Sequence, residues 1–115
     1  MKSLQEKLKI VRDTLLKTGL EGKYIFHYER PKTDLTHWVV WMESGEATSF
    51  YSCDRKSEQQ AEGTIDCFTQ IEYDQLLDAI QDALNEEPHI AWNLDFVDYE
   101  DETKLIHYQW TFRVV

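Results

Sequence analysis

The chain has 115 residues, of which 42% are apolar and 30% charged, and this composition predicts one folded domain spanning residues 1–115. A formal net charge of −10 argues against a protein that grips nucleic acid through its phosphates. No apolar run approaches the roughly 18 residues of a membrane-spanning helix, and the N-terminus lacks a signal-peptide core. We therefore expect a protein that is kept in the cytosol or built into a particle there, with no membrane contact.

The charge is divided unevenly along the chain. Residues 1–56 carry ten Lys or Arg and eight Asp or Glu, for a net +2. Residues 57–115 carry two and fourteen, for a net −12, and no cation occurs between Lys56 and Lys104. The acidic half is compatible with a basic partner, with a passage to which DNA must not adhere, or with a solvated surface.

The first predicted element is an amphipathic helix over residues 3–18. Its apolar stripe has spacings of four, three and four residues and consists of Leu4, Leu8, Val11 and Leu15. Ser3 followed by Glu6 resembles a capping box, and Gly19 or Gly22 can end the helix.

Three strands are predicted next, over residues 23–29, 35–42 and 47–53. The first two are expected to form a hairpin around residues 30–34, and a turn is expected at residues 43–46. The second strand has apolar residues on both faces, which indicates a central strand or one whose second face meets another subunit. These residues are Trp38, Val39, Val40, Trp41 and Met42.

Residues 54–63 are predicted to be polar and irregular, with a short turn at residues 59–61, and a fourth strand is predicted over residues 64–69. Residues 73–85 follow as a second amphipathic helix. Its outward face carries three acids at four-residue spacing, Asp74, Asp78 and Asp82. These like charges repel, and either solvent or a cationic partner would offset the repulsion.

The last two strands are predicted as a hairpin. Pro88 ends the second helix, and a fifth strand then runs over residues 90–99 with a β-bulge near Phe96 and Val97. Residues 100–103 turn the chain into a long final strand, around which the domain is expected to be built. Its apolar face alternates as Ile106, Tyr108, Trp110, Phe112 and Val114. The predicted fold class is α+β, a mainly antiparallel sheet with two helices in the order α-β-β-β-β-α-β-β.

No stretch carries a catalytic or cofactor signature. The serines lack a glycine-rich elbow, and the four glycines are scattered, so we expect no enzyme and no cofactor. Cys53 and Cys67 are interpreted as two buried thiols, with a disulfide as the alternative.

Two clusters of residues are candidate metal sites. In the expected hairpin His27 and His37 would lie opposite each other, either sharing a metal or simply lying on a polar face. The acids between Asp95 and Glu102 include no glycine for a calcium loop, so an exposed hairpin tip is the preferred interpretation. We therefore predict no metal site.

Three stretches, read together with the first helix, resemble a known family. They are Trp38–Trp41 running into Ser44–Tyr51, then Gln59–Thr69, and finally Asp98–Tyr108. The chain resembles the tail-terminator proteins, also called tail-completion or head–tail joining proteins, of siphophages and prophages of Gram-positive bacteria. Such proteins often carry a glycine where this chain has Lys104, which makes the final hairpin turn the point of departure.

The resemblance implies a structural protein that assembles in the bacterial cytoplasm as a homo-hexameric ring at the tail–head junction of a virion. The ring would cap the tail tube, contact the major tail tube protein and dock to the head connector, with DNA passing through as cargo. A monomeric acidic binding module for a basic protein and another neck or head-completion adaptor are the alternatives. The expected interface residues lie in two loops and on the second strand: Arg30, Lys32, Trp38, Trp41, Arg55, Lys56, Gln59 and Gln60.

Overall fold

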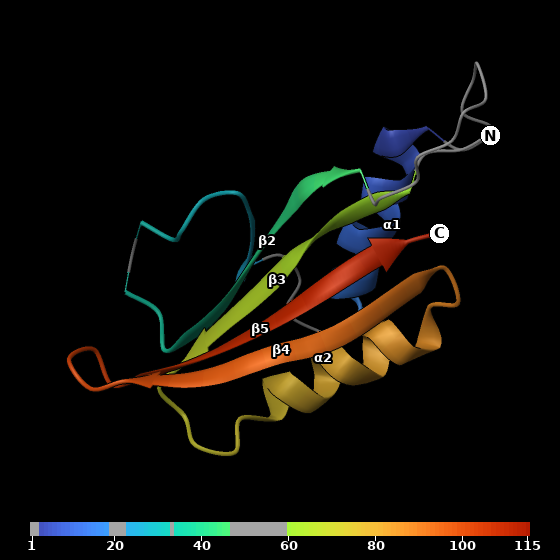
Figure 1. Ribbon diagram of the computed structural model, residues 1–115. Helices are drawn as coiled ribbons and strands as arrows, with labels where there is room; N and C mark the ends of the chain where they lie inside the picture. Colours follow the sequence, from blue (N-terminus) through green and yellow to red (C-terminus); the bar gives the residue numbers. More distant parts are fainter. Residues whose placement is uncertain (1–2, 19–22, 33, 47–59) are drawn as a thin grey trace.

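The structure is a computed structural model that describes residues 3–18, 23–32, 34–46 and 60–115. Two helices and five strands follow in the order α1 (Leu4–Leu16), β1 (Ile25–His27), β2 (His37–Glu46), β3 (Ala61–Thr69), α2 (Gln75–Glu86), β4 (Ile90–Glu100) and β5 (Leu105–Val114). The strands form one sheet in the order β1-β2-β3-β5-β4 (Figure 1). The α+β class is confirmed, and the strand predicted over residues 47–53 lies outside the described residues.

The pairing of the first two strands contradicts the prediction. β1 runs parallel to β2, with His27 beside Trp41, whereas a hairpin would make them antiparallel. The backbone of Tyr28 is left-handed, with a φ of 73°, and it turns the chain away directly after His27. His27 and His37 therefore do not face each other, and the hairpin that would have placed a metal between them does not form.

β2 and β3 are both longer than the sequence pattern predicted. The turn expected at residues 43–46 is instead the end of β2, which continues through a bulge between Glu43 and Gly45. Gly45 adopts a φ of 151° that favours glycine, so a residue expected to end the strand bends it instead. β3 begins at Ala61, and the predicted loop and short turn are wrong for residues 61–63.

Both helices cover the same face of the sheet. α1 begins as predicted, with the Ser3 hydroxyl accepting a hydrogen bond from the Glu6 backbone N–H at 3.1 Å. The core between helices and sheet contains Val11 and Leu15 of α1, Ile80 and Leu84 of α2, and the aromatic side chains of β5. Trp110 and Phe112 are fully buried there, so the predicted apolar face of the last strand is confirmed.

α2 begins one residue after a buried cap. Asp74 accepts from the Leu76 backbone N–H at 2.9 Å and from the Thr69 hydroxyl at 2.7 Å. The predicted row of three outward-facing acids is therefore wrong for Asp74, because N-capping requires its carboxylate to turn back toward the helix terminus. Only Asp78 and Asp82 of that row are exposed.

The opposite face of the sheet has a second, smaller cluster. Trp38, Val40 and Leu105 are buried there, and Phe26, Leu35 and Phe68 pack against them. Together with Val39 and Trp41 on the helix side, this makes β2 apolar and buried on both faces, as its sequence predicted.

The predicted β4–β5 hairpin is confirmed, and it gives the molecule its long shape of 50 × 26 × 25 Å. A bulge between Leu94 and Phe96 moves the apolar side from even to odd positions, close to where the sequence pattern broke. In Figure 1 the hairpin tip extends well beyond the N-terminal end of α2. Within the described residues, neither helix is long and apolar enough to cross a membrane.

Candidate functional site

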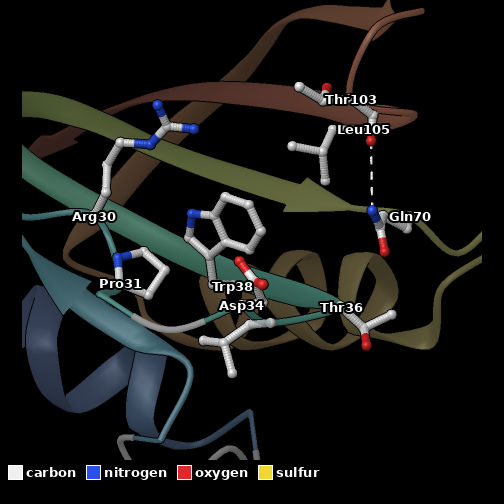
Figure 2. Close-up of a pocket in the computed structure, with 9 residues that line it drawn as sticks. Arg30, Pro31, Asp34, Thr36, Trp38, Gln70, Thr103 and Leu105 are labelled. Atoms are coloured by element: carbon white, nitrogen blue, oxygen red, sulfur yellow. Dashed lines mark hydrogen bonds between the residues drawn. The ribbon is translucent and has the colours of Figure 1, made fainter.

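A cavity of about 740 Å³ opens between the loop that precedes β2 and the start of β5 (Figure 2). It is lined by Arg30, Pro31, Asp34, Leu35, Thr36, Trp38, Gln70, Thr103 and Leu105. The Gln70 backbone N–H donates to the Thr36 carbonyl oxygen at 3.0 Å, and its side-chain amide donates to the Thr103 carbonyl oxygen at 3.4 Å. One residue after β3 thus ties the loop and the hairpin together across the cavity wall.

The floor of this cavity holds an indole N–H without an acceptor. Trp38 is 7% exposed, and its ring stacks on Phe68 with centroids 5.2 Å apart. Its Nε1 is the one buried side-chain polar atom without a hydrogen-bond partner in the described part of the chain. In Figure 2 this nitrogen lies on the side of the ring that faces Arg30 and Pro31. A buried donor without an acceptor costs about 1–3 kcal/mol, so a ligand that places an acceptor here would remove this cost.

Arg30 lies over the same aromatic pair. Its guanidinium carbon is 5.5 Å from the Phe68 ring centroid, a distance typical of a cation–π contact. Arg30 is exposed and forms no ion pair with any described residue, although Asp34 lines the same cavity. The cavity is therefore lined by a guanidinium and an indole N–H, both of which only donate hydrogen bonds. Such a pair suits a ligand group that only accepts, such as a carboxylate.

A second, smaller groove of about 330 Å³ lies between α1 and the β1–β2 pair. The imidazole of His27 stacks between Tyr28 and Trp41, at centroid distances of 3.7 and 3.8 Å. Glu43 accepts hydrogen bonds from His27 and from the Tyr28 hydroxyl. Burial alone would raise the pKa of Glu43, but these two donors lower it. The hydrogen bond to Glu43 raises the pKa of Tyr28. This cluster fastens the short strand β1 to β2.

The outer edge of the sheet is a third exposed feature. Among the described residues β4 pairs with β5 alone, and most of its side chains are exposed. Its distal half carries four large exposed apolar side chains, with Val97 54% and Tyr99 53% exposed. They are Leu94, Phe96, Val97 and Tyr99, and Ile71 and Tyr73 add two more between β3 and α2. A long, apolar, unpaired edge is the kind of surface on which proteins add a neighbouring chain.

The hairpin tip next to this edge is acidic. Asp98, Asp101 and Glu102 are exposed and form no ion pair with a described residue, and Glu100 accepts from the Thr103 hydroxyl at 2.9 Å. Lys104 is left-handed, with a φ of 60°, at the position where relatives of the resembled family carry glycine. The tip therefore forms despite the departure, as an exposed turn with four carboxylates within five residues.

The described residues of the predicted interface lie in more than one place. Arg30, Lys32 and Trp38 lie at or next to the large cavity, whereas Trp41 is 3% exposed and contributes to the core on the other face of the sheet. Gln60 directly precedes β3, and three more lie outside the described residues, namely Arg55, Lys56 and Gln59. Sequence reasoning missed the β4 edge, although apolar residues on both sides of the bulge were a visible signal.

All four histidines face a carboxylate. The pairs are His27–Glu43, His37–Asp74, His89–Glu87 and His107–Asp66, each at 2.7–2.8 Å. A metal site needs a third ligand, and no group of three or more His, Cys, Asp or Glu residues is placed to hold an ion in the described ranges. Cys67 is buried, and desolvation raises the pKa of its thiol, so it is not a reactive nucleophile. Cys53 lies outside the described residues.

No family model matches the sequence, and no curated protein sequence matches it. Among solved structures, a chain from the virion of a native gene transfer agent particle has the same fold, with a TM-score of 0.57. The match covers 97% of this chain and 92% of that chain at 12% sequence identity. At this identity the likeness establishes a shared fold over nearly the full length of both chains.

Proposed function

We propose that the protein is a structural component of a phage-type virion, and more narrowly a tail terminator. In this role it caps the tail tube as a ring, contacts the major tail tube protein and joins the tube to the head connector. The observation that carries the proposal is the near full-length fold match to a chain of a virion. Gene transfer agents are phage-like particles, and the sequence independently resembles a phage neck family.

The surface of the chain supports an assembly role. No described residue pairs with the outer side of the eleven-residue strand β4, and the distal half of this strand carries exposed apolar side chains. A protein that acts alone normally protects such an edge with lysine, proline or a covering loop. β4 has a bulge beside Asp95 and three acidic side chains, but the apolar side chains of its distal half stay exposed, which supports the view that another subunit covers them.

The charge distribution supports passage of DNA without binding. The acidic half, with a net −12 over residues 57–115, would repel phosphates if it lined a lumen. Six copies in a ring would make that repulsion symmetric around the passing DNA. Stoichiometry and the orientation of the acidic surface toward the lumen are part of the proposal.

The proposal is tested by polymerising the major tail tube protein of the same phage or prophage with and without this protein. Negative-stain electron microscopy should show shorter tubes with a ring at one end and no decoration along the side. Val97→Asp places a charge on the apolar edge and should abolish the cap, whereas Asp82→Asn on the exposed face of α2 serves as a matched control. Tubes of unchanged length would contradict the proposal, and binding of a basic protein by a lasting monomer would support the binding-module alternative.

A further inference from the structure

We infer that the cavity beside Trp38 and Arg30 binds the acidic tip of the β4–β5 hairpin from a second copy of this chain. This contact rests on the proposed ring, for which it supplies a specific subunit interface. The tip is defined as residues 98–102, and the cavity residues that recognise it are Arg30 and Trp38.

Two donors of the cavity have no acceptor, although Asp34 also lines it, and three carboxylates of the tip have no cation partner among the described residues. The Trp38 indole N–H is unpaired although the side chain is 93% buried, since its exposure is 7%, and the neighbouring Arg30 guanidinium has no carboxylate partner among the described residues. Asp98, Asp101 and Glu102 in turn have no cation partner in the described part of the chain. A carboxylate between the guanidinium and the indole would satisfy both donors with charge-assisted hydrogen bonds.

Charge complementarity between the cavity and the tip favours a second copy of this chain as the occupant. The tip of the same molecule does not meet Arg30, although Thr103, next to it, lines the cavity wall. Lys32 is exposed two residues after Arg30 and adds a second cation at the rim. The tip lies at the end of a protruding hairpin, and its carboxylates at Asp98, Asp101 and Glu102 are exposed, so they can approach a cavity of about 740 Å³.

The contact joins two different surfaces of the same chain. Contacts of this kind are heterologous, and they close into a ring when the rotation between neighbours divides a full turn. The unpaired β4 edge lies on the same hairpin as the tip, so a neighbour that holds the tip would also approach the exposed side chains of Val97 and Tyr99. The cavity contact would therefore set which copy covers the edge.

Charge exchange tests the inference. Self-association of the full chain is measured by sedimentation velocity, alone and in the presence of tail tubes. Arg30→Glu and the pair Asp101→Lys with Glu102→Lys should each weaken association by at least about tenfold, because close charge pairs at interfaces are strongly coupled. The triple variant, which combines Arg30→Glu with Asp101→Lys and Glu102→Lys, again places opposite charges on the two surfaces and should recover association. Asp34→Asn removes from the cavity a negative charge that repels the carboxylates of the tip, so it should strengthen association.

Trp38→Phe separates recognition from folding. An aromatic ring stays at this position and the unpaired donor is lost, but the smaller ring leaves a void, so the two effects on thermal unfolding of the monomer oppose each other and the shift should be small, while association weakens about fivefold. The inference would be overturned if none of these variants altered the association of the wild type, or if the triple variant stayed dissociated. It would also be overturned if the wild-type chain were monomeric both alone and in the presence of tubes. Tube length in the same samples separates the two proposals. If the charge variants still cap tubes, only the proposed subunit contact is contradicted. If the triple variant regains association but tubes are not capped, only the tail-terminator role is contradicted.

Discussion

The two ends of the sheet differ in what covers them. At one end the last residues of β5 lie beneath both helices, and Trp110 is 1% exposed. At the other end the β4–β5 hairpin runs past α2, and Val97 is 54% exposed. Both ends show the same alternation of apolar and polar residues. The difference teaches that the covered end supplies the stability of the monomer, while the open end remains available for a partner.

The strongest way to break this comparison is to truncate one large apolar side chain at each end. Trp110→Ala leaves a large cavity under the helices and should lower the free energy of unfolding by about 3–5 kcal/mol, measured by urea denaturation. Val97→Ala is the matched change at the open end and should cost less than about 1 kcal/mol. Equal costs at the two ends would contradict the division between a covered and an open end.

Gly63 tests how tightly the covered end is packed. A Cβ at this position would overlap the Met42 carbonyl oxygen and lie 2.6 Å from the Phe112 ring and 2.8 Å from the Glu43 Cα. Two of these three atoms belong to the backbone of β2 and cannot move without disturbing the strand. Gly63→Ala should therefore cost about 1–3 kcal/mol in chemical denaturation, and a neutral result would show that β2 can shift.

Asp74 caps the N-terminus of α2 and makes the stability of the fold depend on pH. Burial alone would raise the pKa of Asp74, but hydrogen bonds from Leu76, Thr69 and His37 lower it in the folded chain. The unfolded carboxyl therefore takes up a proton first as the pH falls, and the stabilisation, present at neutral pH, is lost below about pH 4.

Asp74→Ala should cost about 0.5–2 kcal/mol at pH 7, typical of a lost N-cap. The cost should shrink as the pH approaches 3, measured by thermal unfolding across that range. A cost that stays constant with pH would mean that the charge of Asp74 plays no part.

Lys104 gives the smallest expected effect and tests the open end alone. A left-handed backbone is unfavourable for a residue with a Cβ by about 1–2 kcal/mol. Lys104→Gly relieves this strain but frees the unfolded chain, so we expect a net gain of up to about 1 kcal/mol. A loss of stability would show that the lysine side chain holds the turn, and Lys104→Ala is the control that removes the side chain without relieving the strain.

Much of the fold could be predicted from the sequence because its strongest signals are local. The capping box at Ser3, the stripe of the second helix and the alternation of β5 each depend on neighbours within one element. The parallel pairing of β1 could not be predicted, because Pro31 and Asp34 indicate a turn without indicating which way the chain leaves it. The bulge at Gly45 was misread for a similar reason, since glycine serves turns and bulges alike.

The candidate site was less predictable than the fold. Arg30 and Trp38 were singled out from the loop and from the double-faced strand, but their position around one cavity depends on Gln70 and Leu105, which are distant in sequence. Trp41 was grouped with Trp38, although strand alternation sends the two rings to opposite faces. The exposure of the apolar stretch of β4 could not be predicted, because sequence does not show where a covering helix ends.

The most direct test of the proposed role is the length of tail tubes assembled in the presence of this protein. Tubes grown from purified tube protein should become short and carry a ring at one end when it is added at a low molar ratio. The same distribution of lengths with and without it, in tubes that bear no ring, would contradict the proposal that this chain terminates a tail.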